Sequence, residues 1–241
     1  ISSVWTQFDY QILDYYYQLA LDQNKIVLSE EDVVYLVITD ETYIHSGKST
    51  LDREYVARAN EQLATFEPEA VAFDLIFARP SFPETDNRLA SSFASLGSVY
   101  LPYGFGIQQS PHRFRWEPGT AYDKLRDEFR FVPSEKGEGS PYFADRATVQ
   151  HDKFAQQSNG SGHISATSDP DGVYRHVCML VRVDSAYVPT VTLAMFLNYN
   201  DVPMDSLRVD WGTSITVPAV AGSFLDQDLI IPIDEAGRTY I

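Results

Sequence analysis

Two nearly continuous apolar runs, separated by one segment with helical periodicity, constrain the fold of this chain more than any other feature. The runs cover residues 33–39 and 70–77, and such composition is typical of strands buried on both faces of a parallel sheet. The segment between them predicts a helix over residues 49–66, with Ser49 as its N-cap. The apolar positions that share one face of this helix are Leu51, Tyr55, Ala59 and Leu63. We therefore expect a βαβ unit with adjacent, parallel strands and a right-handed crossover.

The remaining periodicity extends this unit to an α/β fold. We predict a central, mostly parallel sheet with flanking helices, a long N-terminal helix over residues 3–22, and a mixed or antiparallel C-terminal part. Residues 40–48 are predicted as a loop, 158–162 as a flexible joint, and 234–237 as a hairpin turn between the last two strands. Further helices are predicted at 87–96, 122–129, 148–156 and 190–198, and further strands at 99–103, 173–183, 207–209, 214–217, 229–233 and 238–241.

The length and composition of the chain limit its domain organisation and its classes of partner. We expect one domain over residues 1–241, in which residues 1–22 form a membrane-proximal helix and residues 104–161 an elaborated insertion. The chain has 34 acidic and 18 basic residues, a formal net charge of −16, which argues against nucleic acid and anionic lipid as partners. One cysteine, Cys178, excludes an internal disulfide. No apolar run reaches the roughly 20 residues of a membrane helix, and because the chain begins at Ile1 without methionine we interpret it as a piece of a longer protein.

An acidic turn, Asp169-Pro170-Asp171-Gly172, leads into an apolar strand that begins at Val173 and contains Arg175 two residues further on. A buried carboxylate must be paired or hydrogen-bonded. We therefore favour an internal Asp74–Arg175 salt bridge that fixes this turn on the sheet over a direct role of either residue in ligand binding. The alternate acids Asp169 and Asp171 could begin a calcium loop, but its remaining ligands are missing, so a turn built by proline and glycine is the better interpretation.

Two further acids follow the first predicted strand. Ligands of open parallel sheets bind beyond the C-terminal ends of the strands, which is where Asp40 and Glu41 fall. Together with Asp74 they could form a carboxylate cluster for acid–base or metal-assisted hydrolysis. The five histidines show no metal-ligand spacing and no Gly-x-Ser-x-Gly nucleophile elbow occurs, which weighs against an enzyme.

Several short motifs follow one another along the chain. They are Phe8-Asp9, Asp40-Glu41, Asp74, Asp86 with Leu89 and Ala90, Gly162-His163, Asp169-Pro170-Asp171-Gly172, Arg175, and Val191-Thr192-Leu193-Ala194. In this order they resemble the second type of CHASE domain, the extracellular sensory module of bacterial histidine kinases and adenylate or diguanylate cyclases, over most of the chain. One stretch departs from the family pattern of glycine, tryptophans and prolines, then arginine. Gly47 and Arg53 are present, but residues 48–52 replace the aromatic part, so no role of that loop is carried over.

The resemblance implies a non-catalytic, ligand-sensing domain on the extracytoplasmic face of the bacterial membrane. It also implies membrane helices that flank the chain, a cytoplasmic effector, and a small molecule or ion as the signal, with no cofactor and no metal. We further expect weak homodimerisation through the N-terminal helix. The alternative function is a secreted or periplasmic hydrolase that uses the Asp/Glu cluster. The candidate ligand-binding residues are Asp40, Glu41, Asp74, His163, Asp169, Asp171 and Arg175.

Overall fold

The computed structural model describes residues 12, 14–15, 33–47 and 51–240. They belong to two compact units, residues 1–50 and residues 51–241. The predicted helix over residues 3–22 lies mostly outside the described residues, although Ile12, Asp14 and Tyr15 are helical.

The first unit contains helix α2 (Asp40–Ser46), where the sequence predicted a loop. A capping box explains this helix, because Thr39 and Thr42 satisfy each other's backbone amides, and Asp40 and Glu41 lie in the first turn, where the helix dipole favours acids. Gly47 ends it in the left-handed conformation, at φ 65°. The predicted strand at 33–39 is wrong, since these residues form no strand. An apolar run indicates burial, whereas a strand also requires a neighbour for its backbone hydrogen bonds.

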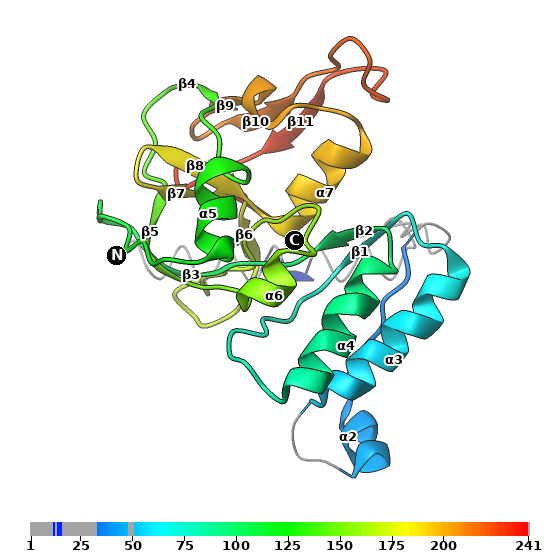
Figure 1. The fold of residues 1–241 in the computed structure, drawn as a ribbon. Coiled ribbons are helices and arrows are strands. Elements are labelled where there is room, and N and C mark those ends of the chain that lie inside the picture. Colours follow the sequence, from blue (N-terminus) through cyan, green and yellow to red (C-terminus); the bar gives the residue numbers. More distant parts are fainter. Residues whose placement is uncertain (1–11, 13, 16–32, 48–50, 241) are drawn as a thin grey trace. The chain divides into compact units, whose positions relative to one another are not determined.

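The second unit begins with an α/β layer (Figure 1). Its elements are α3 (Arg53–Leu63), the 3₁₀ turn η1 (Ala64–Phe66), β1 (Ala70–Ala72), α4 (Pro83–Ala94) and β2 (Ser98–Tyr100). Helix α3 has Asp52 as its N-cap, which accepts a hydrogen bond from the Glu54 amide at 3.1 Å. Strands β1 and β2 are parallel, with Val71 opposite Val99. The predicted parallel neighbour of 70–77 was therefore the wrong strand: β2 follows β1 in the chain, and α4 makes the crossover.

A strand-like segment at residues 158–163 lies in the middle of the second unit, where the sequence predicted a flexible joint. Parallel bridges join Gly160 to Tyr100 and His163 to both Tyr103 and Thr190. Ser158, Ser161 and His163 are buried. Glycines here serve close approach rather than flexibility, because a Cβ atom on Gly160 would lie 2.3 Å from the Tyr100 ring.

Antiparallel pairing dominates the rest of the second unit. Within the described residues one sheet has the order β3-β5-β7-β8 and another β11-β10-β9-β4. Each contains one parallel pair, β5–β7 in the first and β4–β9 in the second. The strands are β3 (Gly104–Gln108), β4 (Ser134–Lys136), β5 (Tyr142–Thr148), β6 (His176–Cys178), β7 (Leu180–Val183), β8 (Ala186–Pro189), β9 (Arg208–Asp210), β10 (Ser214–Val217), β11 (Leu229–Pro232) and β12 (Arg238–Tyr240). The fold is α/β as predicted, but the residues that the structure describes form no central, mostly parallel sheet.

The helices of this part lie close to their predicted positions. They are α5 (Thr120–Asp127), α6 (Asp152–Ala155) and α7 (Val191–Tyr199). The 3₁₀ turn η2 (Met204–Ser206) was not predicted. The Thr190 hydroxyl caps α7 by accepting the Leu193 amide at 3.2 Å. Residues 104–161 contribute β3 and β5 to a sheet and buried aromatic side chains to the core, so this segment is integral to the unit.

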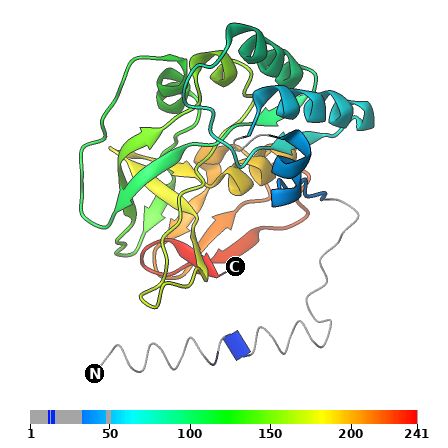
Figure 2. The ribbon, with the colours of Figure 1, turned by 90° about the horizontal axis from the view of Figure 1, so that it is seen from below.

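The C-terminal part departs from prediction in two places. The strand predicted at 173–183 is divided at Met179 into β6 and β7. The turn at 234–237 exists, with Gly237 donating to the Asp234 carbonyl oxygen at 3.0 Å, but it joins no hairpin: β11 pairs with β10, and β12 pairs with β6. Figure 2 shows these C-terminal strands, in orange and red, on the side of the unit opposite to α3 and α4.

Candidate functional site

The acidic turn forms as the sequence predicts. The Gly172 amide donates to the Asp169 carbonyl oxygen at 2.8 Å, and the Asp169 amide donates to the Val173 carbonyl oxygen at 2.8 Å. Gly172 adopts φ 85°, a conformation that glycine reaches without steric cost. The Asp171 carboxylate accepts the Val173 amide at 3.1 Å. These local bonds fix both acids of the turn in defined positions.

Asp169 is the most enclosed charge of this region, with a side chain that is 0% exposed. His176 Nδ1 lies 2.8 and 3.1 Å from its two carboxylate oxygens. Arg238 Nη1 lies 3.4 Å and Arg175 Nη1 3.6 Å from the same group. A buried carboxylate is tolerated only with such partners. Asp169 therefore joins the turn, β6 and β12 through one side chain.

Each of the two arginines is held by a second aspartate. Arg175 Nη1 contacts both oxygens of Asp171, at 3.0 and 2.9 Å. Arg238 Nε donates to Asp234 at 2.8 Å. Burial opposes ionisation of Asp171, but hydrogen bonds from the Val173 amide and from Arg175 outweigh it and hold the pKa of Asp171 below its usual value. Likewise, burial works against the charge of Arg238, yet the bond to Asp234 raises the pKa of Arg238.

We call these six residues the aspartate cluster. They are Asp169, Asp171, Arg175, His176, Asp234 and Arg238. Of these residues, Asp169, Asp171 and Arg175 were predicted from the sequence, and the other three were not. A signal was present, because the spacing Asp-x-x-x-Arg occurs at 171–175 and again at 234–238.

His163 lies in the central segment, and its contacts do not involve the aspartate cluster. Its Nδ1 accepts the Ser165 amide at 3.2 Å, which places the ring proton on Nε2. That Nε2 is buried without a hydrogen-bond partner among the described residues. Desolvation lowers the pKa of His163 to about 3, so the imidazole is neutral at physiological pH.

Of the other candidate residues, Asp74 lies in the second unit and does not join this cluster. Asp40 and Glu41 occupy the first turn of α2 in the first unit. Asp74 follows β1, is exposed, and forms no ion pair with any described residue. The predicted Asp74–Arg175 salt bridge is thus wrong, because Arg175 pairs with Asp169 and Asp171, which lie close to it in the chain.

A second buried ion pair, which the sequence argument did not expect, links α3 to α4. Arg53 donates to Asp86, and Asp86 also accepts the Ser81 amide at 2.9 Å. The Arg53 guanidinium lies 5.5 Å from the ring centroid of Phe77 and 5.2 Å from that of Phe154. The Asp86 side chain is only 4% exposed. The pair fixes the N-terminal ends of α3 and α4.

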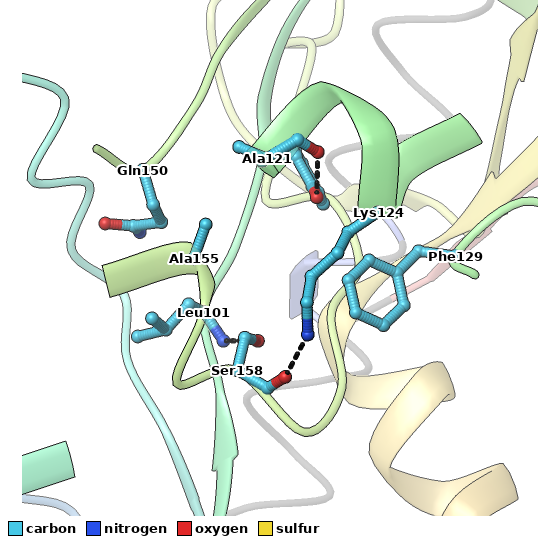
Figure 3. Close-up of a pocket in the computed structure, with 8 residues that line it drawn as sticks. Leu101, Ala121, Lys124, Phe129, Gln150, Ala155 and Ser158 are labelled. Carbon is cyan, nitrogen blue, oxygen red and sulfur yellow. Dashed lines mark hydrogen bonds between the residues drawn. The ribbon is translucent and has the colours of Figure 1, made fainter. Parts of the chain in front are cut away.

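A small cavity lies between α5, α6 and the segment around Ser158 (Figure 3). Its volume is about 10 Å³. Lys124 Nζ donates to the Ser158 carbonyl oxygen at 2.8 Å, and the Gln150 side chain bonds the Phe77 amide and the Leu75 carbonyl oxygen. Pockets for small ligands measure roughly 300–1,000 Å³, and one water needs about 10–15 Å³. The cavity therefore has room for one water at most and is not a ligand pocket in this conformation.

Two negative findings apply to the part of the chain that the structure describes. No three His, Cys, Asp or Glu side chains gather there closely enough to hold a metal ion. No helix there is long and apolar enough to cross a bilayer.

The described residues form an α/β domain in which the enclosed carboxylate of Asp169 is paired with one histidine and two arginines. The family model named CHASE2 domain matches residues 1–241, the whole chain. The chain therefore belongs to the CHASE2 domain family, whose members are extracellular sensory domains and not catalytic ones. The resemblance seen in the sequence is confirmed. No curated protein and no solved structure matches the chain.

Proposed function

We propose that the chain is the extracytoplasmic ligand-sensing domain of a bacterial membrane-bound signalling receptor. The match of the CHASE2 family model to residues 1–241 carries this proposal, because the family is an extracellular sensory one. In the receptor, helices that flank this chain cross the membrane and connect it to a cytoplasmic kinase or cyclase. The acidic net charge of −16 agrees with a small-molecule or ion signal rather than a nucleic acid.

The outer part of the aspartate cluster is the proposed ligand contact. Asp171 has a side chain that is 23% exposed, and its neighbours Val173 and Tyr174 are exposed. A ligand can thus reach a carboxylate and an aromatic ring at one turn, and the Arg175 side chain that pairs with this carboxylate is 11% exposed. Asp169 lies behind them and is enclosed. This arrangement supports a site that recognises a small polar molecule or an ion and passes its effect inward.

A thermal-shift screen of small metabolites and ions tests the proposal, because a ligand that binds the folded state raises the melting temperature by mass action. The variants are Asp171→Asn and, as a matched control, Asp228→Asn, which removes an exposed carboxylate paired with Arg208. We expect at least one compound to give a saturable shift in the wild type and the control, with a tenfold or greater loss of affinity in Asp171→Asn. No saturating compound, or equal affinity in all three proteins, would argue against the proposal.

Self-association through the helix at residues 3–22 is part of the proposed receptor mechanism. Its expected apolar stripe includes Phe8 and Ile12. Separated from membrane anchors, the domain loses effective concentration, so we expect a weak dimer. Sedimentation velocity should show association that rises with protein concentration and falls in Phe8→Asp. A wild-type chain that stays monomeric at high concentration would remove this part of the mechanism.

A further inference from the structure

Strand β12 is attached to the second unit by few backbone contacts. Within the described residues it pairs with β6 alone, through Arg238–Cys178, Thr239–Val177 and Tyr240–His176. Backbone hydrogen bonds to other segments hold the turn before it more firmly. The Gly237 carbonyl oxygen accepts the Met179 amide at 2.9 Å, and the Glu235 carbonyl oxygen accepts the Ser140 amide at 2.7 Å. The turn also holds the first residue of β12, because the Arg238 amide donates to the Asp234 carboxylate at 2.9 Å and the Arg238 carbonyl oxygen accepts the Asp234 amide at 3.0 Å. Separation of β12 from β6 that includes Arg238 must therefore break these bonds as well.

Side chains of the aspartate cluster add the remaining attachment of β12. Arg238 reaches Asp169 at 3.4 Å, and the ring of Tyr240 lies 4.2 Å from the ring of His176, centroid to centroid. Because Asp169 and His176 are both buried, a departing β12 would remove one cation from an enclosed carboxylate. Asp169 would keep His176 and Arg175 as partners but lose Arg238, and the loss of one partner from an enclosed charge is costly, so the charge network opposes opening.

We infer that Asp169 is the centre of a charged latch that holds β12 on β6 and couples it to the turn at 169–172. The inference deepens the proposed function and rests on it for the identity of the input. Arg175 is shared between Asp171 and Asp169, so a ligand that engages Asp171 changes the charge available to Asp169. Asp169 holds Arg238 by the same carboxylate. A change at the exposed turn thereby alters the opening equilibrium of β12.

Hydrogen exchange of the unliganded chain, read by mass spectrometry or NMR, tests the latch. The variants are Asp169→Asn, Arg238→Gln as a milder change at a partly exposed position, and Asp228→Asn as the control. We expect amides of residues 238–240 to exchange at least tenfold faster in the first two variants, with β9, β10 and the control unchanged. Unchanged exchange at 238–240, or equal acceleration across the whole unit, would overturn the latch. Because no ligand is present, failure here is distinct from failure of the ligand screen.

Discussion

Gly162 lies so close to Val191 that a Cβ atom on Gly162 would stand 2.5 Å from the Val191 amide nitrogen. The neighbouring atoms are backbone, so no side chain can rotate away to make room. The contact brings the central segment against the start of α7, where the His163 carbonyl oxygen accepts the Val191 amide at 3.1 Å. Glycine is required at this position by close approach and not by an unusual φ.

We expect Gly162→Ala to destabilise the domain by roughly 3 kcal/mol or more, as overpacking of a rigid site does. The control is Gly172→Ala, where a Cβ meets nothing within 4 Å and only the left-handed φ is unfavourable. That variant should lose about 1–2 kcal/mol. Urea denaturation measures both, and a Gly162→Ala loss no larger than that of the control would contradict the close-approach argument.

Asp86→Asn should destabilise the domain far more than Asp74→Asn. Asp86 is buried and receives the Ser81 amide and the Arg53 guanidinium, whereas Asp74 is exposed and forms no ion pair with a described residue. Breaking a buried pair costs roughly 3–5 kcal/mol, and a surface change stays within about 0.5 kcal/mol. The free energy of unfolding in urea distinguishes them. Equal values for both variants would show that the Arg53–Asp86 pair contributes little.

His163 should make the stability of the domain depend on pH below 6.5. The unfolded chain binds a proton near pH 6.5, but burial lowers the pKa of His163 to about 3 in the folded state. The stabilising contribution is therefore complete above pH 6.5 and is lost progressively as pH falls from 6.5 toward 3. Its slope is about 1.4 kcal/mol per pH unit.

The variant His163→Asn isolates this effect, because its side-chain oxygen can still accept the Ser165 amide. Urea unfolding at pH 7, 6, 5 and 4.5 should show a shallower decline in the variant, since the other titrating groups are common to both proteins. Buried or paired carboxylates whose pKa is lowered, Asp86 and Asp171 among them, lose their contributions only at more acidic pH. Identical slopes over this range would mean that His163 is protonated in the folded state.

The sequence predicted local elements better than their pairing. Helix α7, capped by Thr190, and strand β10 were found almost at their true bounds because periodicity and capping are local signals. The partners of 70–77 and of the final strand were wrong, because neither apolar runs nor turn residues specify which strand lies alongside. The glycine-rich segment at 158–162 was misjudged for a similar reason: composition does not separate a flexible glycine from one required by close contact.

The candidate site was predicted only in part, because local signals find residues that are close in the chain but not those that strand pairing brings together. Asp169, Asp171 and Arg175 lie within seven residues of one another, so a turn motif could bring them together. His176 belongs to the following strand, and Asp234 and Arg238 come from the far end of the chain through β6–β12 pairing. Asp74 was assigned to Arg175 because an acid in an apolar run was expected to be buried, whereas the chain after β1 leaves it exposed.

The most direct test of a sensory role at the aspartate cluster is hydrogen exchange of the wild-type domain with and without a compound found by the thermal-shift screen. The account predicts slower exchange at residues 169–176 on binding, together with a change at residues 238–240, both absent in Asp171→Asn at the same compound concentration. A saturating compound whose protected amides lie elsewhere, with 169–176 and 238–240 unchanged, would contradict the account.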